Sequence, residues 1–470
     1  MGQEAGHGPA SLFALLDERR WVMFDLVGEV LAHSLVKILM IFALVCCLTN
    51  LRIPLGFALL VGAFLVGVSF DMAPGAVASE FGRSAVAPAT IELALLVGLI
   101  LALSHLLSSA GQMRRMVAAL GAVVRNTKAR LAILPGLIGL LPMPGGALFS
   151  APMVKEASDG SDYEAHHITA INHWFRHVWE YCWPLYPGLL LVPSLIKGEP
   201  LSVLQYAAIQ SPLTVAALIA GFIFVFGRVK PPPAPAVSNQ PLSRRGWELL
   251  ASVSPILVII ASLALLSLAA RYAPATVRSA AAGLYERVPF KSWALLGGLV
   301  VAIVYVLLTS DISPGRELKK VLRTKQLWLL VLMVFGIKIF AGLIGAAEAA
   351  DQVRDWLQQQ NVPLLVIAAV LPFLVGLITG ITVAFVGVAF PLLLGLVSDM
   401  PLAHQLSYMV FAYVWGFTGV LVSPVHVCLV ATSEYFETNL TKTYRWLLPA
   451  SAAVILAATG MHLVLRYGWA

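Results

Sequence analysis

The chain has 470 residues, of which 59% are hydrophobic and only 12% are charged, and its formal net charge is +7. A soluble domain needs about twice that charged fraction to cover its surface, so the composition excludes the soluble classes. Because the inner loops of membrane proteins carry extra Lys and Arg, the positive charge indicates a membrane orientation, and we expect no nucleic acid partner.

Continuous apolar runs along the chain predict membrane-spanning helices. Each run, with its flanks, can cross about 30 Å of hydrocarbon as a helix, and the runs do not alternate as β-barrel strands would. Residues 1–34 form an N-terminal extension in which no removable signal sequence is visible. Ten spans are expected, near 35–50, 54–70, 90–109, 171–195, 202–227, 248–270, 292–309, 326–347, 405–430 and 446–466.

A proline-rich stretch at 228–246 divides these spans into two halves. Its run Pro-Pro-Pro-Ala-Pro at 231–235 cannot be helical and predicts a cytoplasmic linker between a first transmembrane repeat, 35–227, and a second, 247–470. The Gly-Leu-Ile run at 136–138 returns at 376–378, Pro152 returns as Pro391, and the Val-Trp pair at 178–179 returns at 414–415. Offsets of 236 to 240 residues persist through these matches, which favours an ancient duplication.

Each half also holds one apolar region that Gly and Pro interrupt, at 131–154 and at 362–396. Five spans per half is an odd number, so the second half should be inverted in the membrane. With the N-terminus outside, most loop Lys and Arg residues fall inside. We therefore predict an all-α polytopic membrane protein of two inverted repeats, each with five transmembrane helices plus a re-entrant hairpin.

The interrupted regions predict two hairpin tips. Pro142 and Pro144 remove amide donors, whereas Gly145 and Gly146 permit backbone that a helix forbids. In lipid such irregular chain must face protein or water, and amides exposed near helix N-termini can bind an anion. Prolines that only kink a packed helix are the structural alternative. The second tip offers hydroxyls and carbonyls for a cation or a substrate oxygen, from Thr379, Gly380 and Thr382.

Ionisable residues interrupt the span at 171–195. His173, Arg176, His177 and Glu180 fall at i, i+3, i+4 and i+7, on one helical stripe, and Asn172 lies beside them as a further substrate ligand. Charged groups inside a span are costly and by default mark a pathway. Arg176 can pair with Glu180 or clamp an anion with its planar guanidinium. Glu180 is then the expected proton carrier, with His173 and His177 as relays; a cluster at the membrane interface is the alternative.

We expect no metal site and no cofactor. His173 and His177, with His166 and His167 nearby, have helical spacing, but no Cys or carboxylate cage lies near them in sequence. The cysteines lie in apolar segments without a CxxC pair, which predicts small buried packing residues. They are Cys46, Cys47, Cys182 and Cys428.

Two spans meet proline where a helix would continue. The first meets Pro187, and the second meets Ser423 and Pro424, with Thr418 and His426 as further polar groups. Such spans should be discontinuous helices whose unwound backbone offers carbonyls to a ligand near mid-membrane, although simple packing kinks are an alternative.

Enzyme motifs are missing from the chain. There is no HExxH sequence, no GxSxG elbow and no Gly-rich phosphate loop with a Lys. Without a nucleotide-binding motif, ion-coupled or facilitated transport is favoured over ATP-driven transport. Lys338 lies in the middle of a span and must face protein or water, either as a structural counter-ion or as part of the pathway.

Two segments resemble a known family. The run Leu-Pro-Met-Pro-Gly-Gly-Ala-Leu-Phe-Ser-Ala-Pro-Met at 141–153 and the run Trp-Phe-Arg-His-Val-Trp-Glu-Tyr at 174–181 resemble the prokaryotic domain-of-unknown-function family 401. That family is grouped with the ion transporter superfamily, which includes divalent-anion/sodium symporters, arsenite exporters, and gluconate and lactate permeases. The resemblance implies re-entrant hairpins, inverted repeats and a homodimer with elevator-type movement. Neither tip carries the Ser-Asn-Thr signature of the sodium-dicarboxylate relatives, so sodium coupling and dicarboxylate specificity do not carry over.

The sequence thus predicts a secondary active transporter for a small organic anion, in the bacterial inner (cytoplasmic) membrane. We expect a proton rather than sodium as the coupling ion, an elevator-type mechanism, and lipid and a second copy of the chain as partners. A cation/proton antiporter or an oxyanion exporter is the alternative within transport. A membrane enzyme or a lipid-head-group translocase is the alternative of another class.

Overall fold

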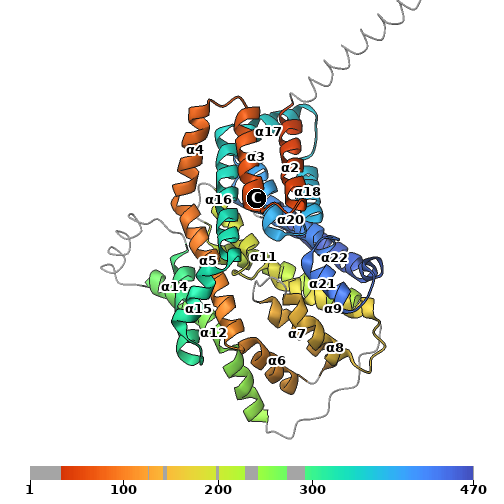
Figure 1. Cartoon of the computed structure of the whole chain (residues 1–470). Helices are drawn as coiled ribbons and strands as arrows, with labels where there is room; N and C mark the ends of the chain where they lie inside the picture. Colours follow the sequence, from red (N-terminus) through yellow and green to blue (C-terminus); the bar gives the residue numbers. More distant parts are fainter. Residues whose placement is uncertain are drawn as a thin grey trace, which may run out of the picture.

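The computed structural model describes residues 33–124, 126–140, 146–196, 201–227, 242–272 and 292–468, and every regular element within these ranges is a helix (Figure 1). The first half contains α2 (Ser34–Asn50), α3 (Leu55–Ser69), α4 (Pro74–Val86), α5 (Pro88–Ser109), α6 (Gln112–Val123), α7 (Thr127–Gly139), α8 (Gly146–Ser158), α9 (Ala165–His177), the 3-10 turn η1 (Val178–Tyr181), α10 (Pro187–Leu195), α11 (Val203–Ala220) and the π-helical turn η2 (Gly221–Val225). The second half contains α12 (Leu242–Tyr272), α14 (Trp293–Thr309), α15 (Pro314–Arg323), α16 (Lys325–Ala346), α17 (Ala349–Gln359), α18 (Leu364–Thr379), α19 (Thr382–Leu396), α20 (Leu402–Leu421), α21 (Val427–Tyr435) and α22 (Leu440–Tyr467).

Five of the described helices are long and apolar enough to cross a membrane: α5, α11 with η2, Gly246–Leu266 of α12, α16 and α22. Shorter apolar helices accompany them, namely α2, α3, α14, α18 and α19. Large apolar side chains lie outside on these helices; Leu308 of α14 is 80% exposed and Leu456 of α22 is 72% exposed. A surface of this kind is stable against lipid and not against water, so the chain is a polytopic membrane protein.

Helical hairpins stand where Gly and Pro interrupt the apolar sequence. In the first half α7 runs towards the tip and α8 leaves it; the tip residues 141–145, which include the predicted ligands Pro142, Pro144 and Gly145, lie outside the described part of the chain. In the second half α18 ends at Thr379 and α19 begins at Thr382. Gly380 between them has a φ of 64°, a left-handed conformation that favours glycine, so this reversal depends on that residue.

Both spans that were predicted to be discontinuous are broken. In the first, α9 ends at His177 and continues only as the turn η1, and α10 begins afresh at Pro187. Proline suits that first helical position because the amide there has no partner within the helix. In the second, α20 ends at Leu421 and α21 begins at Val427. One detail of the prediction is wrong: the polar stripe is not on one continuous helix, because Glu180 lies in η1.

The hairpins pack closely on the broken helices. A Cβ atom added to Gly376 of α18 would lie 3.1 Å from the amide nitrogen of Val420 in α20, and one added to Gly419 would lie 2.9 Å from the amide nitrogen of Leu377. In the first half, a Cβ on Gly139 of α7 would overlap the carbonyl group of Arg176 in α9. Glycine therefore allows hairpin and broken helix to touch backbone to backbone in both halves.

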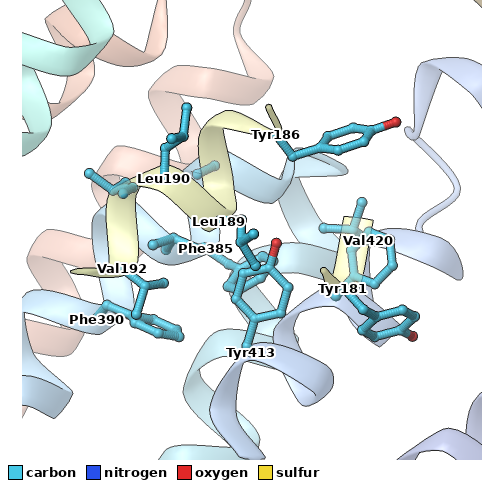
Figure 2. Packing of buried hydrophobic residues seen from close by; sticks show 14 of the residues in the cluster. Tyr181, Tyr186, Leu189, Leu190, Val192, Phe385, Phe390, Tyr413 and Val420 are labelled. Atoms are coloured by element: carbon cyan, nitrogen blue, oxygen red, sulfur yellow. The ribbon is translucent and has the colours of Figure 1, made fainter. Parts of the chain in front are cut away.

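An aromatic cluster lies beneath the breaks (Figure 2). Tyr413 of α20 packs edge-on against Phe385 and Phe390 of α19, with ring centroids 5.4 and 6.5 Å apart, and Leu189 of α10 lies beside it. The Tyr413 hydroxyl donates to the carbonyl oxygen of Glu180 at 3.0 Å. Since this ring is fully buried among apolar neighbours, it fixes η1 of the first half against α20 of the second.

Candidate functional site

The polar residues of the broken helices meet between the two halves of the chain. Helix α21 of the second half packs against α8 and α9 of the first, and α19 packs against α10. Two runs that are far apart in the sequence, 172–180 and 423–432, therefore contribute side chains to one buried region. That region is the candidate site.

Glu180 is held by groups from both halves. Its side chain is buried, and its Oε1 atom lies 2.5 Å from Nδ1 of His177 while Oε2 accepts from the Thr382 hydroxyl at 2.9 Å. The sequence allowed Arg176, four residues earlier, as a partner of Glu180, with an anion clamp as its other possible role. The carboxylate instead contacts the His177 imidazole, because a 3-10 turn aligns residues three apart. A carboxylate this deeply buried is stable only when its oxygens are hydrogen-bonded, and both oxygens have partners here.

Three buried histidines surround a common centre next to Glu180. The ring centroids of His173 and His177 are 4.8 Å apart, those of His177 and His426 are 4.9 Å apart, and those of His173 and His426 are 5.3 Å apart. Nε2 of His177 and Nε2 of His426 lie 3.3 Å from each other. One nitrogen from each ring falls within 4.8 Å of the other two, a spacing that could hold a metal ion.

Arg176 lies on the other side of His177 and is also buried. Its Nη1 atom donates to Sγ of Cys428 in α21 at 3.2 Å. Its guanidinium faces the start of α8: a Cβ added to Gly146 would lie 3.0 Å from Cζ of Arg176 and 3.1 Å from Nε. Of the predicted tip ligands in the first half, Gly146 is the one within the described residues, and it does lie at Arg176. Positive charge and a helix N-terminus therefore coincide at this point.

Asn172 bridges to the second half. Its Nδ2 atom donates to the hydroxyl of Thr432 at 3.1 Å, and that hydroxyl donates in turn to the carbonyl oxygen of Cys428 at 2.7 Å. The amide oxygen Oδ1 of Asn172 is buried and has no hydrogen-bond partner among the residues that the structure describes. It is free to accept a hydrogen bond from a ligand.

The predicted ligands of the second half serve mainly to shape the break. The Thr379 hydroxyl donates to the carbonyl oxygen of Val375 within α18, and the Ser423 hydroxyl donates to the carbonyl oxygen of Leu377, both at 2.7 Å. Pro424 is exposed in the turn before α21. Gly380 reaches the site through its carbonyl oxygen, which lies 2.7 Å from Nδ1 of His426.

Other polar residues singled out from the sequence lie elsewhere. His167 stacks on Trp446 with ring centroids 3.9 Å apart and contacts the carbonyl oxygen of Val225, so it is not part of the histidine cluster. Lys338 donates to the carbonyl oxygen of Ser194 at the end of α10, at 2.6 Å. It lines a separate cavity of about 590 Å³ that also reaches Asp351 of α17.

Sequence reasoning missed the second-half partners of the stripe. His426 was noted as a polar group at the break, but nothing in the sequence places it beside His177, 249 residues away. Cys428 was predicted to be a packing residue and Thr432 was not singled out, although each bonds to a residue of the 172–180 run. His426, Cys428 and Thr432 share one sequence feature. They lie at i, i+2 and i+6 in the segment that follows Ser423-Pro424, where α21 begins.

Comparisons with known proteins give the chain a family and a similar fold. The chain matches the sequence model of a family described as "Protein of unknown function (DUF401)" over residues 33–292 and 290–465. Among solved structures, the fold is similar to that in "Crystal structure of the Alcanivorax borkumensis YdaH transporter reveals an unusual topology". The TM-score is 0.55 and the sequence identity 16%, with 84% of this chain and 88% of that chain covered, so the likeness concerns the fold. No curated protein matches the chain.

Proposed function

The chain belongs to the DUF401 family of membrane proteins, and from that premise we propose that it is a secondary active transporter of a small organic anion. The observation that carries the proposal is Arg176. This residue is 3% exposed and lies at the junction of a hairpin and two broken helices. Burying such a charge is expensive, and an arginine kept there at that cost is suited to recognising an oxyanion through its planar fork of donors.

The groups around Arg176 fit an anionic ligand. The N-terminal end of α8 approaches the guanidinium through Gly146, and amides at a helix N-terminus favour negative charge. The unpaired Oδ1 of Asn172 lies one helical turn away and could accept a hydrogen bond from a hydroxyl or amine of the same ligand. A carboxylate that carries a second polar group would use both.

Glu180 is the proposed carrier of the coupling proton. Its two oxygens are shared between His177 of the first half and Thr382 of the second, so a proton arriving at this carboxyl would loosen the contact between the halves. The histidine cluster offers nitrogen atoms through which that proton can move. Sodium is the less favoured coupling ion, because the two hairpin tips lack the signature of the sodium-coupled relatives.

The packing supports an elevator-type movement of inverted repeats. The hairpins and broken helices pack on one another, through α7 with α9, α18 with α20, and α21 with α8 and α9. The flanking helices α3, α4, α5 and α14 pack around α16 or on one another. The two groups meet where α16 touches α19 and α10 touches α5. In the proposal the first group slides on the second, within a homodimer in the bacterial inner membrane.

Thermal stabilisation of the purified protein tests the anion site. A ligand that binds the folded state stabilises it by RT ln(1 + [L]/Kd), about 2.7 kcal/mol at 100 times Kd, so weak binding is detectable at high ligand concentration. Among a panel of carboxylates and other oxyanions, at least one should raise the melting temperature of the native chain and of Arg445→Ala, whose arginine lies exposed on α22. Arg176→Ala should lose that shift. If no anion stabilises the native chain, or if Arg176→Ala responds equally, the anion site is wrong.

Uptake into proteoliposomes tests the coupling ion. With the stabilising anion as substrate, an inward proton gradient should drive accumulation, and Glu180→Gln should abolish that drive while leaving anion binding in place. If accumulation follows a sodium gradient and ignores the proton gradient, proton coupling is refuted.

The histidine cluster favours one second candidate, a cation/proton antiporter. Three imidazoles and a carboxylate in one buried place can exchange a proton for a cation. Stabilisation by a cation, with no response to any anion, would favour this function over the first.

A further inference from the structure

We propose that His173, His177 and His426 form a binding site for a divalent transition-metal ion of the zinc type. The inference goes beyond the proposed transport of an anion, because it assigns a ligand to groups that anion recognition at Arg176 does not use. It rests on the orientation of the three rings, on the spacing of their nitrogens and on the groups behind them.

Each ring has one nitrogen tied to an oxygen that accepts a hydrogen bond. Nδ1 of His177 faces Oε1 of Glu180 at 2.5 Å, and Nδ1 of His426 faces the carbonyl oxygen of Gly380 at 2.7 Å. Nε2 of His173 faces the carbonyl oxygen of Leu421 at 3.0 Å. A carbonyl oxygen only accepts, so the facing nitrogen carries the hydrogen and the other nitrogen of the same ring presents a lone pair.

Histidines that bind metals are held in this way. The ring nitrogen away from the metal almost always donates to a carboxylate or a backbone carbonyl, which fixes the tautomer and the ring orientation. All three rings of the cluster meet that condition, with partners from η1, from the second hairpin tip and from the end of α20. The sequence around each histidine could not predict this arrangement, because two of the three oxygens that hold the rings belong to helix breaks.

The spacing of the inward nitrogens fits a shared ion. Nε2 of His177 and Nε2 of His426 are 3.3 Å apart. Two nitrogens bound to Zn²⁺ at about 2.05 Å in tetrahedral geometry lie about 3.3–3.4 Å from each other. Without an ion or an extra proton, two lone pairs would face each other across this distance, which is unfavourable. Nδ1 of His173 is buried and has no hydrogen-bond partner within the described ranges, so it is the nitrogen of this ring that is left for an ion.

The chemistry of the site defines the ligand class. Three neutral imidazoles suit Zn²⁺, Co²⁺ and related ions, and three protein ligands leave a fourth coordination position open. Glu180 lies behind His177 and adds negative charge, so it would act as a positioning residue and not as a ligand. A proton shared between His177 and His426 is the competing occupant of the same lone pairs, and the experiment below separates the two.

Titration of the tag-free, chelator-treated protein with Co²⁺ in detergent tests the proposal. The native chain should bind a single ion per chain with the intense visible absorption of four-coordinate Co²⁺, and Zn²⁺ should displace it. His426→Gln and His173→Gln should each weaken binding by more than about 100-fold, since even loss of an outer partner costs 10–100-fold. Glu180→Gln should fall within that smaller range. His404→Gln is the matched control, because this histidine of α20 contacts the carbonyl oxygen of Arg466 and lies outside the cluster; its affinity should be unchanged.

Two results would overturn the metal site. One is a native chain that shows no absorption of four-coordinate Co²⁺ in the titration. This result needs no variant and leaves the proton as the occupant. The other is binding that persists at full affinity in His426→Gln. The titration contains no organic anion, and Arg176→Ala should keep the Co²⁺ spectrum while losing the anion response. Failure of the metal site and failure of the anion site are thus distinguishable.

Discussion

The hydrogen bond from Thr382 to Glu180 is one of several contacts between the two halves, and its strength reports the charge of the carboxyl group. Thr382→Val removes the hydroxyl with little change of shape. A hydrogen bond to an ionised group contributes about 1.5–3 kcal/mol, whereas hydrogen bonds between neutral groups inside membrane proteins average about 0.6 kcal/mol. Because His177 pairs with the same carboxylate at 2.5 Å, we expect the larger value.

The assay is unfolding by a denaturing detergent in mixed micelles, which gives the free energy of unfolding. Thr382→Val should lower it by about 1.5–3 kcal/mol. Thr459→Val is the control, because its hydroxyl bonds only to the carbonyl oxygen of Ile455 in its own helix. A double-mutant cycle with Glu180→Gln isolates the pair, and a coupling above about 1 kcal/mol is expected for groups in direct contact. A loss of about 0.6 kcal/mol or less, equal to that of the control, would refute an ionised Glu180 held by this bond.

Two further predictions concern other parts of the chain. Gly146→Ala places a Cβ 3.0 Å from Cζ of Arg176, so anion affinity should fall about tenfold or more, equivalent to about 1.4 kcal/mol. Gly460→Ala is the control and should bind the anion normally, because no atom lies within 4 Å of its added Cβ. Equal affinities of the two variants would show that the anion does not use this guanidinium. The hydrogen bond from Lys320 holds the pKa of Glu317 at about 2, below its ordinary 4.5. This group therefore stabilises the fold above pH 4.5, and the stabilisation is lost as the pH falls towards 2. Glu317→Gln should lose that part of the pH dependence of the melting temperature, and parallel curves of melting temperature against pH for the native chain and the variant would contradict the prediction.

Much of the layout follows from local sequence. Apolar runs give the spans, and Pro187 and Pro424 mark the breaks, because a proline has no amide hydrogen to donate to the preceding turn of a helix. Glycine at 380 marks the second tip for a similarly local reason. These are properties of a few neighbouring residues, and they need no knowledge of the rest of the chain.

The pairing within the site does not follow from local sequence. The stripe allowed an Arg176–Glu180 pair or an anion clamp by Arg176, but Glu180 lies in a 3-10 turn where His177 is its partner. His426 and Cys428 join only because α21 folds back onto α9. Long-range contact of this kind depends on the packing of whole helices, which periodicity does not encode.

The carbonyl groups released by the helix breaks have a consequence for ion preference. An unwound helix exposes oxygen atoms that can replace the hydration shell of a hard cation such as Na⁺. Here the oxygens of Leu421 and Gly380 face histidine rings, and that of Leu377 accepts from Ser423. The backbone oxygens serve to orient imidazoles, and the centre they enclose is lined with nitrogen. In the metal site proposed above, the chemistry of the donor atoms would discriminate against hard ions, whatever the size of the opening.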